Sequence, residues 1–420
     1  MPYSDDALRP LRILHLSDIL FEEKPGGSRQ VARELLREQI KAGHDATLLV
    51  SRSAPGAPQQ FRDAEYGNVV QYDKGGDPTA WVRNGREACE KLLREAAREN
   101  KPFDVVHTHF AYAALGPLQA IKNSMPHVRT FHGPWDTEGF VEDTANARKN
   151  PIVLAKALLK RRMRFGIEQA NLRSAAAILT LSGVFQNELR RFGIDPEKAT
   201  IIPGGVNRDR FNVEVDDSEA RIKARARVGL PEATFPLLLS IRRLVPRMGL
   251  ENLLTSFPRV REVFPFARLV IGGRGPLDEA LRTLATSLGI ADAVTFAGFI
   301  PDDQVTDYYR GADVFVLPTL SLEGFGLVTV ESLACGTPVI ATPVGAIPEV
   351  LGSLEERLLT NGTDARALSD AVLRYFQAKK SGEAWATNLS AKRLSGYVDD
   401  RYTWAKHAHA VEAVYRRILK

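Results

Sequence analysis

The sequence predicts an α/β protein made of two doubly wound domains, each with a mainly parallel sheet between layers of helices. Three observations lead to this prediction. The chain has 420 residues, which is room for two domains of ordinary size. Short β-branched runs alternate with longer amphipathic segments, as in successive βαβ units. The alternation begins again after PGGVNRDRF (203–211), so the two halves share one plan.

In the first half, apolar runs at 11–18 and 45–51 predict two buried strands. Between them, residues 28–43 have helical spacing and end on glycine, a common helix stop. Further strands are expected in DVVHTHF, HVRTFHG and AAAILTLS. We assign residues 1–205 to this domain.

The second half contains five more strand candidates, separated by helical segments: FPLLLSIRRL, ARLVIGG, VTFAGF, DVFVLPT and PVIATP. We assign residues 206–399 to the second domain. The last segment, 402–420, has helical spacing and no strand after it. The sequence leaves open which domain it packs on, and a return of about 400–420 to the first domain is one option.

Composition is that of a soluble globular protein, with 44% hydrophobic and 25% charged residues. No run approaches the roughly 18 apolar residues that span a bilayer. The amino terminus, MPYSDDALRP, lacks the apolar core of a signal peptide. Cys89 and Cys335 are too few for a disulfide framework. We therefore expect a cytoplasmic protein.

Positive charge is concentrated in residues 146–175, where eight lysines and arginines accompany Glu168 alone. Apolar residues at helical spacing in 151–172 predict a basic amphipathic helix. Such a helix is either solvated or lies on an anionic membrane surface, and the second option would make 148–164 a peripheral contact at the inner face of the membrane. Aromatic residues do not alternate with the charges, so nucleic-acid binding is not expected.

The stretch SLEGFGLVTVE places Glu323 before a glycine turn and Glu331 after it. A helix predicted to begin near Leu327 would direct its free N–H groups outward and attract a phosphate. Carboxylates instead accept hydrogen bonds from hydroxyl groups. A nucleotide sugar, with hydroxyls on both sides of a diphosphate, would satisfy the whole arrangement. Spacing alone leaves open a purely structural alternative. In it, Glu323 is a carboxylate that the helix dipole favours near the helix start, and Glu331 is a solvated helix residue.

Two other turns, LSIRRLVPRMG and VIGGRGPL, also follow predicted strands. Because the carboxyl ends of parallel strands share one edge of a sheet, all three turns should meet there. Arg242 and Arg243, with Arg247 and Arg274 nearby, would supply positive charge for a diphosphate. Each taken singly could also be an ordinary surface arginine.

This combination of motifs resembles retaining glycosyltransferase family 4 (glycosyl transferases group 1). SIRRLVPRMG, IGGRGPL, VTFAGFIP, the Glu323–Glu331 pair and ESLACGTPVIAT occur in the family's order. PGGSRQVAREL, DVVHTHF, TFHG, LTLSGVFQNEL and IIPGGVNRDRF do so in the first half, and the resemblance covers about residues 11–360. It implies the GT-B fold, in which two Rossmann-like domains face each other across an interdomain cleft. The first domain (1–205) would bind the acceptor and the second (206–399) the nucleotide-sugar donor.

The resemblance implies a metal-independent hexosyltransferase. It would move a hexosyl group from a nucleotide diphosphate sugar, first of all a UDP-sugar, to an acceptor hydroxyl with retention at the anomeric carbon. The product would be a glycan, glycolipid or glycoside. Catalytic roles are implied for Glu323, His132 and Arg243. Donor binding is implied for Gly26, Gly27, Arg242, Arg247, Gly273, Gly298, Phe299, Ile300, Glu323, Gly324, Phe325, Gly326, Leu327, Val328 and Glu331.

One position departs from the family pattern. Met248 stands where the family has a lysine, and a thioether cannot neutralise phosphate, so Arg247 or Arg242 is expected to supply the charge. No metal site is expected, because Asp-x-Asp is absent and His107 and His109 are expected to point to opposite faces of a strand.

Other functions remain possible on the same scaffold: a sugar-nucleotide epimerase, a phosphorylase, or an inactive nucleotide-sugar-binding homologue. A dinucleotide-dependent dehydrogenase is disfavoured, because no G-x-G-x-x-G follows the first strand. The acceptor, the donor base and sugar, and the oligomeric state are left undecided by the sequence.

Overall fold

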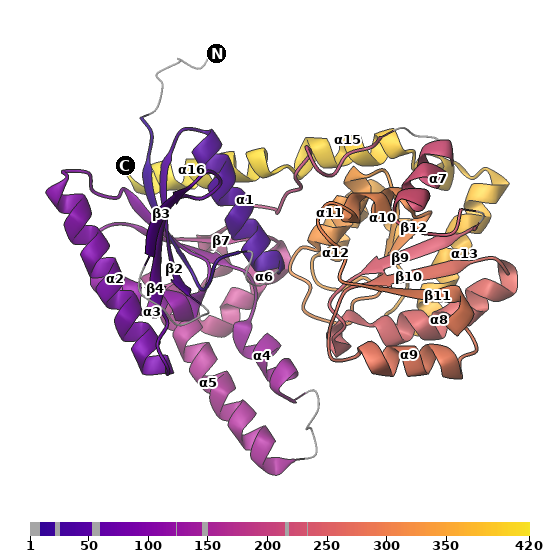
Figure 1. Cartoon of the computed structure of the whole chain (residues 1–420), viewed down its shortest axis with the longest axis horizontal. Coiled ribbons are helices and arrows are strands. Elements are labelled where there is room, and N and C mark those ends of the chain that lie inside the picture. The colour runs from indigo at the N-terminus through magenta and orange to yellow at the C-terminus, as the bar shows by residue number, and fades with distance from the viewer. Residues whose placement is uncertain are drawn as a thin grey trace. The chain divides into compact units, whose positions relative to one another are not determined.

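The computed structural model describes residues 9–21, 26–52, 59–122, 124–144, 150–214, 218–232 and 234–420. The chain forms two compact units (Figure 1). The first contains Met1–Pro203 together with Trp404–Lys420, and the second contains Gly204–Thr403. Each unit is a sheet with helices on both faces, as the sequence predicts.

The first unit has a sheet in the order β3-β4-β2-β1-β5-β6-β7-β8. The five predicted strands are present: β1 (Arg12–Ser17), β2 (Asp45–Arg52), β5 (Val105–Thr108), β6 (His127–Phe131) and β7 (Ala177–Thr180). Three others were not predicted: β3 (Gln59–Asp63), which is antiparallel to β4 (Gly67–Asp73), and β8 (Ala199–Ile201). β3 is polar and largely exposed, so it carries no apolar alternation that would reveal a strand.

Helices cover this sheet on both faces: α1 (Gly27–Lys41), α2 (Pro78–Arg98), α3 (Ala111–Ile121), α4 (Trp135–Thr144), α5 (Pro151–Ser174) and α6 (Gly183–Glu188). The final helix, α16 (Trp404–Ile418), joins them and packs against α1. Val411, Val414 and Tyr415 of α16 are buried in one cluster with Ile13 and Leu35. The carboxyl-terminal helix therefore completes the core of the amino-terminal unit.

The second unit has a parallel sheet in the order β11-β10-β9-β12-β13. All five strands coincide with predicted runs: β9 (Leu237–Ile241), β10 (Arg268–Gly272), β11 (Val294–Gly298), β12 (Val314–Leu317) and β13 (Val339–Ala341). Its helices are α7 (Ser218–Arg227), α8 (Leu250–Val263), α9 (Asp278–Ser287), α10 (Val305–Gly311), α11 (Leu327–Ala334), α12 (Ile347–Glu355), α13 (Ala365–Ser381), α14 (Ala384–Thr387) and α15 (Ala391–Arg401).

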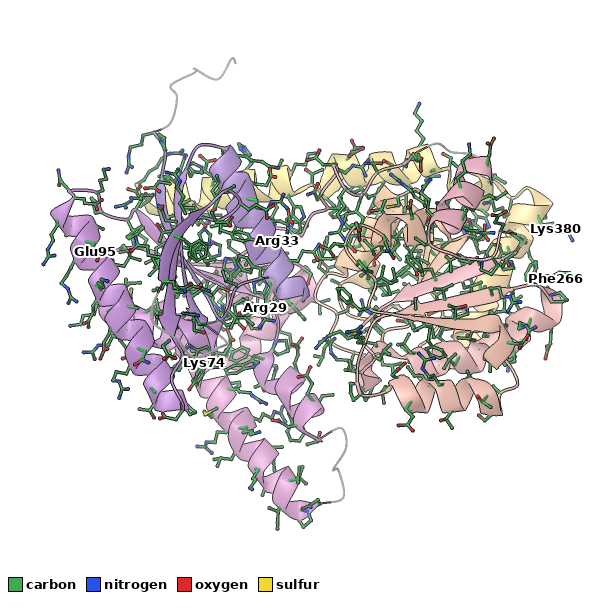
Figure 2. All side chains as sticks on the ribbon, in the orientation of Figure 1. Arg29, Arg33, Lys74, Glu95, Phe266 and Lys380 are labelled. Atoms are coloured by element: carbon green, nitrogen blue, oxygen red, sulfur yellow. The ribbon has the colours of Figure 1, made fainter. Side chains whose placement is uncertain are left out.

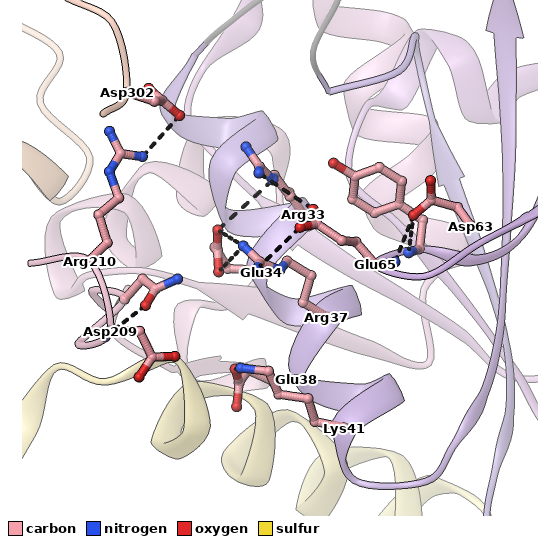
Figure 3. A network of polar contacts seen from close by, with 12 residues as sticks. Arg33, Glu34, Arg37, Glu38, Lys41, Asp63, Glu65, Asp209, Arg210 and Asp302 are labelled. Carbon is pink, nitrogen blue, oxygen red and sulfur yellow. Dashed lines mark hydrogen bonds and ion pairs between the residues drawn. The ribbon is translucent and has the colours of Figure 1, made fainter. Parts of the chain in front are cut away.

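An ion-pair network holds α1 beside the turn between β3 and β4 (Figure 3). Glu65 in that turn pairs with Arg33 at 3.5 Å and with Arg37 at 3.4 Å, and Arg37 also pairs with Glu34 at 3.2 Å. Asp63 accepts a hydrogen bond from the backbone N–H of Glu65 at 2.7 Å. Exposed ion pairs contribute little stability singly, about 0.2–1 kcal/mol. Their combined effect is to orient the helix whose first residue, Gly27, belongs to the predicted site.

The predicted basic helix is α5, although residues 148 and 149 of the predicted contact lie outside the described part of the chain. Its first half exposes apolar side chains: Ile152 is 66% and Leu159 72% exposed. Deeper in the helix, Arg161 and Arg164 pair with carboxylates of α4. Within the described residues, no helix is both long enough and apolar enough to cross a membrane.

Candidate active site

In the second unit, the predicted donor residues gather where β9, β10 and β11 end. Arg242 follows β9, Gly273 follows β10 and Gly298 ends β11. The backbone N–H of Gly273 donates to the carbonyl of Gly298 at 2.6 Å, and that of Arg242 donates to Gly272 at 2.9 Å. Gly273 has φ +127°, and a Cβ there would collide with the carbonyl of Arg242. Glycine at this position therefore allows the loops to meet at one edge.

Arg242 and Glu323 form a partly buried ion pair at this edge. The Arg242 guanidinium donates to a Glu323 carboxylate oxygen, and the two side chains are only 7% and 13% exposed. Since β9 and β12 are neighbours in the sheet, the loops that follow them bring the two side chains together. Arg242 also lies 3.3 Å from the hydroxyl of Thr319. Glu323 is thus held by a cation inside the second unit.

Arg242 also fills the space beside Met248. Its Nη2 atom lies 2.8 Å from the Met248 sulfur, and Met248 is buried. Arg247 instead donates to the backbone carbonyl of Leu322 at 3.1 Å. Of the two arginines that the sequence left as substitutes for a lysine, Arg242 is the one in contact with the methionine.

The loop that carries Glu323 is tied to the turn before α12. The carbonyl of Glu323 accepts a hydrogen bond from the N–H of Ala346 at 2.9 Å. Gly345 has φ +60° and lies so close to Glu323 that a Cβ would collide with its carbonyl oxygen. These contacts set the direction of the chain just before Gly324, and so position the glycine turn.

Helix α11 begins directly after this turn. Gly326 is its N-cap with φ +80°, and no side chain accepts a hydrogen bond there. The first turn, with Leu327 and Val328 half-buried, therefore presents backbone N–H groups and the positive end of the helix dipole. Phe325 faces inward and packs edge-on against Tyr402, with ring centroids 5.5 Å apart. Glu323 accepts no cap hydrogen bond at this helix start, and its carboxylate is paired with Arg242.

Glu331 lies one turn inside α11 and is 7% exposed, so the alternative of a solvated glutamate is wrong. The Tyr309 hydroxyl donates to its carboxylate at 3.0 Å. Burial, together with the charge of Glu331, holds the pKa of Tyr309 well above its ordinary value, and the hydroxyl stays protonated as a donor. A buried carboxylate fixed by a phenol is already oriented to accept further hydrogen bonds.

The remaining predicted residues of this unit surround the same edge. Gly298 has φ +66° at a register shift between β10 and β11. Phe299 is exposed, and the Arg274 guanidinium lies 5.7 Å from its ring centroid. Ile300 is buried beside Gly272. Arg243, next to Arg242, has an exposed side chain.

The other three predicted residues belong to the first unit. Gly26 and Gly27 form the start of α1, where no side-chain hydrogen bond caps the helix. His132 follows β6 and is partly exposed, but its Nδ1 atom is buried. The structure thus assembles the second-unit residues at one edge and places His132, Gly26 and Gly27 in the other unit.

His132 is the end of a chain of buried imidazoles. Its Nε2 lies 3.3 Å from His109 Nδ1, and His109 Nε2 lies 3.4 Å from His15 Nδ1. His15 Nε2 lies 2.7 Å from the side-chain oxygen of Gln39. The amide nitrogen of Gln39 donates to the hydroxyl of Tyr415 on α16 at 3.2 Å.

The hydrogen-bond network assigns the tautomers along this chain. Because the Gln39 oxygen can only accept, His15 donates to it from Nε2 and accepts at Nδ1 from His109. His109 then accepts at Nδ1 from His132 Nε2–H. His132 Nδ1 is left as an acceptor, buried and without a hydrogen-bond partner among the described residues. Burial lowers the pKa of His132 to about 3, so the imidazole is neutral near pH 7.

The prediction that His107 and His109 point to opposite faces is wrong. Their rings stack with centroids 4.4 Å apart, because residues two positions apart in a strand share a face. His107 bonds to Tyr415 and, at 2.7 Å, to Thr130. Ring nitrogens of His15, His107 and His109 lie within 4.8 Å of one another, and each histidine has protein partners. Sequence reasoning missed His15, Gln39 and Tyr415. The only clue to them in the sequence is that each is a polar side chain at a position where the strand or helix is expected to be buried.

Comparisons with known proteins agree with this architecture. Residues 25–210 match the family model described as Glycosyltransferase Family 4, and residues 222–391 match Glycosyl transferases group 1. A D-inositol 3-phosphate glycosyltransferase from Acidothermus cellulolyticus is 32% identical over 78% of this chain and 70% of its own length. A GDP-mannose-dependent phosphatidylinositol monomannoside mannosyltransferase from Mycobacterium tuberculosis is 38% identical over 44% of this chain, which spans half of that relative.

Solved structures show the same fold. Sucrose-phosphate synthase from Thermosynechococcus elongatus has a TM-score of 0.75 at 23% identity, covering 97% of this chain and 99% of its own. Anabaena HepE in complex with UDP has a TM-score of 0.72 at 17% identity, covering 97% of this chain and 100% of its own. The predicted family and fold are confirmed: the chain belongs to glycosyltransferase family 4 and has the GT-B fold.

Proposed function

We propose that this glycosyltransferase moves a hexosyl group from a nucleotide diphosphate sugar to an acceptor hydroxyl, with retention at the anomeric carbon. The observation that carries the proposal is the Arg242–Glu323 pair beside the uncapped start of α11. It combines an acceptor for sugar hydroxyls with N–H donors for a diphosphate. UDP is the first donor to test, because HepE was solved with UDP and UDP-glucose. The mycobacterial relatives are named for GDP-mannose, so GDP-sugars come next.

In this proposal, the chief task of the protein is to stabilise charge on the leaving diphosphate. The first N–H groups of α11 and the exposed guanidinium of Arg243 supply that stabilisation. Glu323 binds hydroxyls of the transferred sugar, and Glu331 binds the ribose. The C–O bond to the diphosphate breaks as the acceptor oxygen bonds to the same carbon on the same face. The acceptor proton passes to the departing phosphate oxygen, so no carboxylate nucleophile is required.

His132 has a defined part in this scheme. Its unpartnered Nδ1 accepts a hydrogen bond from a sugar hydroxyl, since the chain through His109, His15 and Gln39 keeps the proton on Nε2. A neutral imidazole aimed at a hydroxyl orients the sugar without adding a charge near the leaving group. His132 is thus a binding residue at the reacting centre.

The first experiment is a donor screen, with thermal shift and hydrolysis measured across UDP-, GDP- and ADP-sugars. One donor should stabilise the protein and be hydrolysed slowly, with EDTA having no effect. NMR of a transfer product should show the donor's anomeric configuration. An inverted product, or a rate abolished by EDTA and restored by a divalent ion, would refute the retaining, metal-independent scheme. Release of an epimerised nucleotide sugar without an acceptor would favour an epimerase, and phosphate-dependent turnover would favour a phosphorylase.

The Glu323→Ala variant tests the site itself. Sugar transfer should fall at least a hundredfold, while nucleotide binding stays within a few fold, because the helix start remains. The matched control is Asp370→Ala, which removes another arginine-paired carboxylate, on α13. Full activity in Glu323→Ala would remove the basis of the assignment. Equal loss in both variants would point to a general folding defect.

We also infer that the first half of α5 touches an anionic membrane surface from the cytoplasmic side. Exposed Ile152 and Leu159 lie among lysines and arginines, as in helices that bind acidic lipid. Co-sedimentation with phosphatidylglycerol vesicles should be strong for the natural chain and lost in Leu159→Glu. Binding should fall with salt and be absent with neutral phosphatidylcholine. Equal retention of Leu159→Glu on the vesicles would exclude this helix as the contact.

A further inference from the structure

Strand β3 forms one edge of the sheet in the first unit. It is paired with β4 on one side, and no other described strand borders its outer side. Its first four residues, 59–62, are exposed, and Asp63 is half-buried. An exposed edge strand presents unpaired backbone N–H and C=O groups, which are a template for a further strand. β3 is therefore open to pairing with another polypeptide strand.

Phe61, at the centre of β3, keeps much of its ring in water. It lies opposite Val69 of β4, on the face where Val69 packs with Leu36 of α1. The Phe61 side chain is nevertheless 39% exposed, and its ring has no aromatic or cationic partner among the described residues. The middle of this polar strand thus offers apolar surface to a partner.

The residues on either side of Phe61 are polar and largely unpaired. Gln59, Gln60 and Arg62 form no side-chain hydrogen bond or ion pair with any described residue. Asp63 uses its Oδ1 atom to accept two backbone N–H groups of the following turn, at 2.7 and 3.0 Å (Figure 3). Its Oδ2 atom has no partner within the described chain. The strand therefore presents two amides, a guanidinium and a carboxylate oxygen.

The sequence QQFRD is complementary to itself when two copies run antiparallel and meet at Phe61. In this register Phe61 faces Phe61 of the second copy, each Gln60 faces an Arg62, and each Gln59 faces an Asp63. The amide oxygen can accept from the guanidinium, and the amide N–H can donate to the carboxylate. Two aromatic rings at the centre are also a favourable cross-strand pair, and no like charges stand directly opposite each other.

Other registers lose this match. A shift by two residues keeps the two faces of the strands aligned, because side chains alternate with a period of two. Such a shift places either Arg62 opposite Arg62 or Phe61 opposite Gln59. The first arrangement sets like charges against each other, and the second leaves the ring beside an amide. The sequence of β3 therefore specifies one antiparallel register.

The helices beside β3 leave room for a second strand. On one face, a cavity of about 300 Å³ lies between the strand and α2, lined by Gln60, Lys91 and Glu95 (Figure 2). On the other face, α1 reaches the turn after β3 through the pair between Arg33 (Figure 2) and Glu65, 3.5 Å apart. Since residues 59–62 are exposed, neither helix covers the strand.

We propose that the chain self-associates through β3, as a two-fold pair in which the two edge strands run antiparallel with Phe61 at the axis. The two sheets then continue into each other, and both exposed edges are covered. Pairing uses the same edge of both chains, so the assembly closes at two copies. The inference does not depend on the proposed transferase activity.

The pair should be weak. Five residues a side are well below the roughly 20–30 residues a side of a standard interface, so the dissociation constant should be on the order of 0.1 mM. Methods that trap or concentrate the pair are therefore needed.

Disulfide cross-linking of the full chain tests the register. Cα atoms of direct cross-strand partners lie about 4.5–5.5 Å apart, which a disulfide can bridge, whereas diagonal neighbours about 7–8 Å apart lie beyond its reach. Phe61→Cys should dimerise in a glutathione redox couple at least tenfold faster than Phe266→Cys. The latter is the control, at an exposed phenylalanine of the second unit (Figure 2). The natural thiols of Cys89 and Cys335 are buried and should not react.

Two positions beside the axis give an independent reading. Gln60→Cys mixed with Arg62→Cys should form the mixed disulfide, whereas each variant alone should cross-link no faster than Phe266→Cys. Fast cross-linking of Arg62→Cys alone would mean a different register and would overturn the proposal. A Phe61→Cys rate no higher than that of the control would overturn it as well. Thermal unfolding shows that each variant is folded, and the mixed pair keeps the test valid if Phe61→Cys is not.

Sedimentation equilibrium tests the natural chain without a cross-link. Between about 5 and 500 μM, its apparent mass should rise toward that of two chains and no further. Phe61→Lys, which would set two ammonium groups at the axis, should stay monomeric, whereas Phe266→Lys should behave as the natural chain does. A natural chain that stays monomeric throughout, or a mass that grows past two chains, would contradict the closed pair.

Discussion

Mild acid should unfold the first unit selectively, because its histidines are buried in the neutral form. Five are at most 5% exposed: His15, His107, His109, His127 and His407. Burial lowers the pKa of His15, His127 and His407 to about 4, and that of His107 and His109 further. All eight histidines of the sequence lie outside the second unit. The chain therefore contains its own internal control.

The sign of the effect follows from proton linkage. Unfolded histidine binds a proton with a pKa near 6.5, whereas the folded imidazoles stay neutral down to about pH 4. Between these values the unfolded chain binds more protons, so stability falls as the pH falls. From pH 7.0 to 5.5, each of these histidines should cost about 1.2 kcal/mol. The five named above and His132, whose pKa is lowered to about 3, together cost about 7 kcal/mol. That approaches the whole stability of an ordinary domain, about 5–15 kcal/mol.

Hydrogen exchange read by mass spectrometry can follow both units at once. At pH 5.5, after correction for the intrinsic exchange rate, amides of β1, β5 and β6 should lose most of their protection. Amides of β9, β10 and β12 should keep theirs. His127→Asn, away from the Gln39 chain, should recover about 1.2 kcal/mol of the loss. Burial of neutral histidines would be refuted as the cause if both units lost the same free energy of unfolding, or if the first unit lost less than about 2 kcal/mol.

Two further predictions concern the second unit. Met248→Lys alone should not tighten donor binding, because the new ammonium would lie beside the Arg242 guanidinium and repel it. The double variant Arg242→Gly with Met248→Lys should bind the donor within threefold of the natural chain, because the lysine replaces the lost charge. Calorimetric titration with UDP measures the affinity of both variants. Tighter binding by Met248→Lys alone would contradict the inference that Arg242 already supplies the positive charge expected at position 248. Tyr309→Phe should lower the free energy of unfolding by about 1.5–3 kcal/mol, since it removes a donor from buried Glu331. Urea unfolding measures this change, with Tyr375→Phe as the control. The Tyr375 hydroxyl has no hydrogen-bond partner among the described residues, so its removal should change the free energy of unfolding little.

Local pattern was sufficient to predict most of the framework. The five strands of the second unit are apolar runs bounded by Gly and Pro, and each was identified. Gly273 and Glu323 were placed correctly at one edge, since parallel strands end on the same side. The strand β3 was missed because a polar, exposed strand at a sheet edge lacks the alternation that marks a buried strand.

What the sequence by itself determined is the family, the fold and the residues at the ends of the strands. These depend on short-range spacing and on glycines at turns where the backbone adopts a conformation that other residues rarely tolerate. Tertiary structure alone decided which side chains those residues meet. Arg242 reaches Glu323 across 81 positions, and Gln39 reaches Tyr415 across 376. Such contacts leave no periodicity in the chain, because they arise only when separate helices and strands pack into one core.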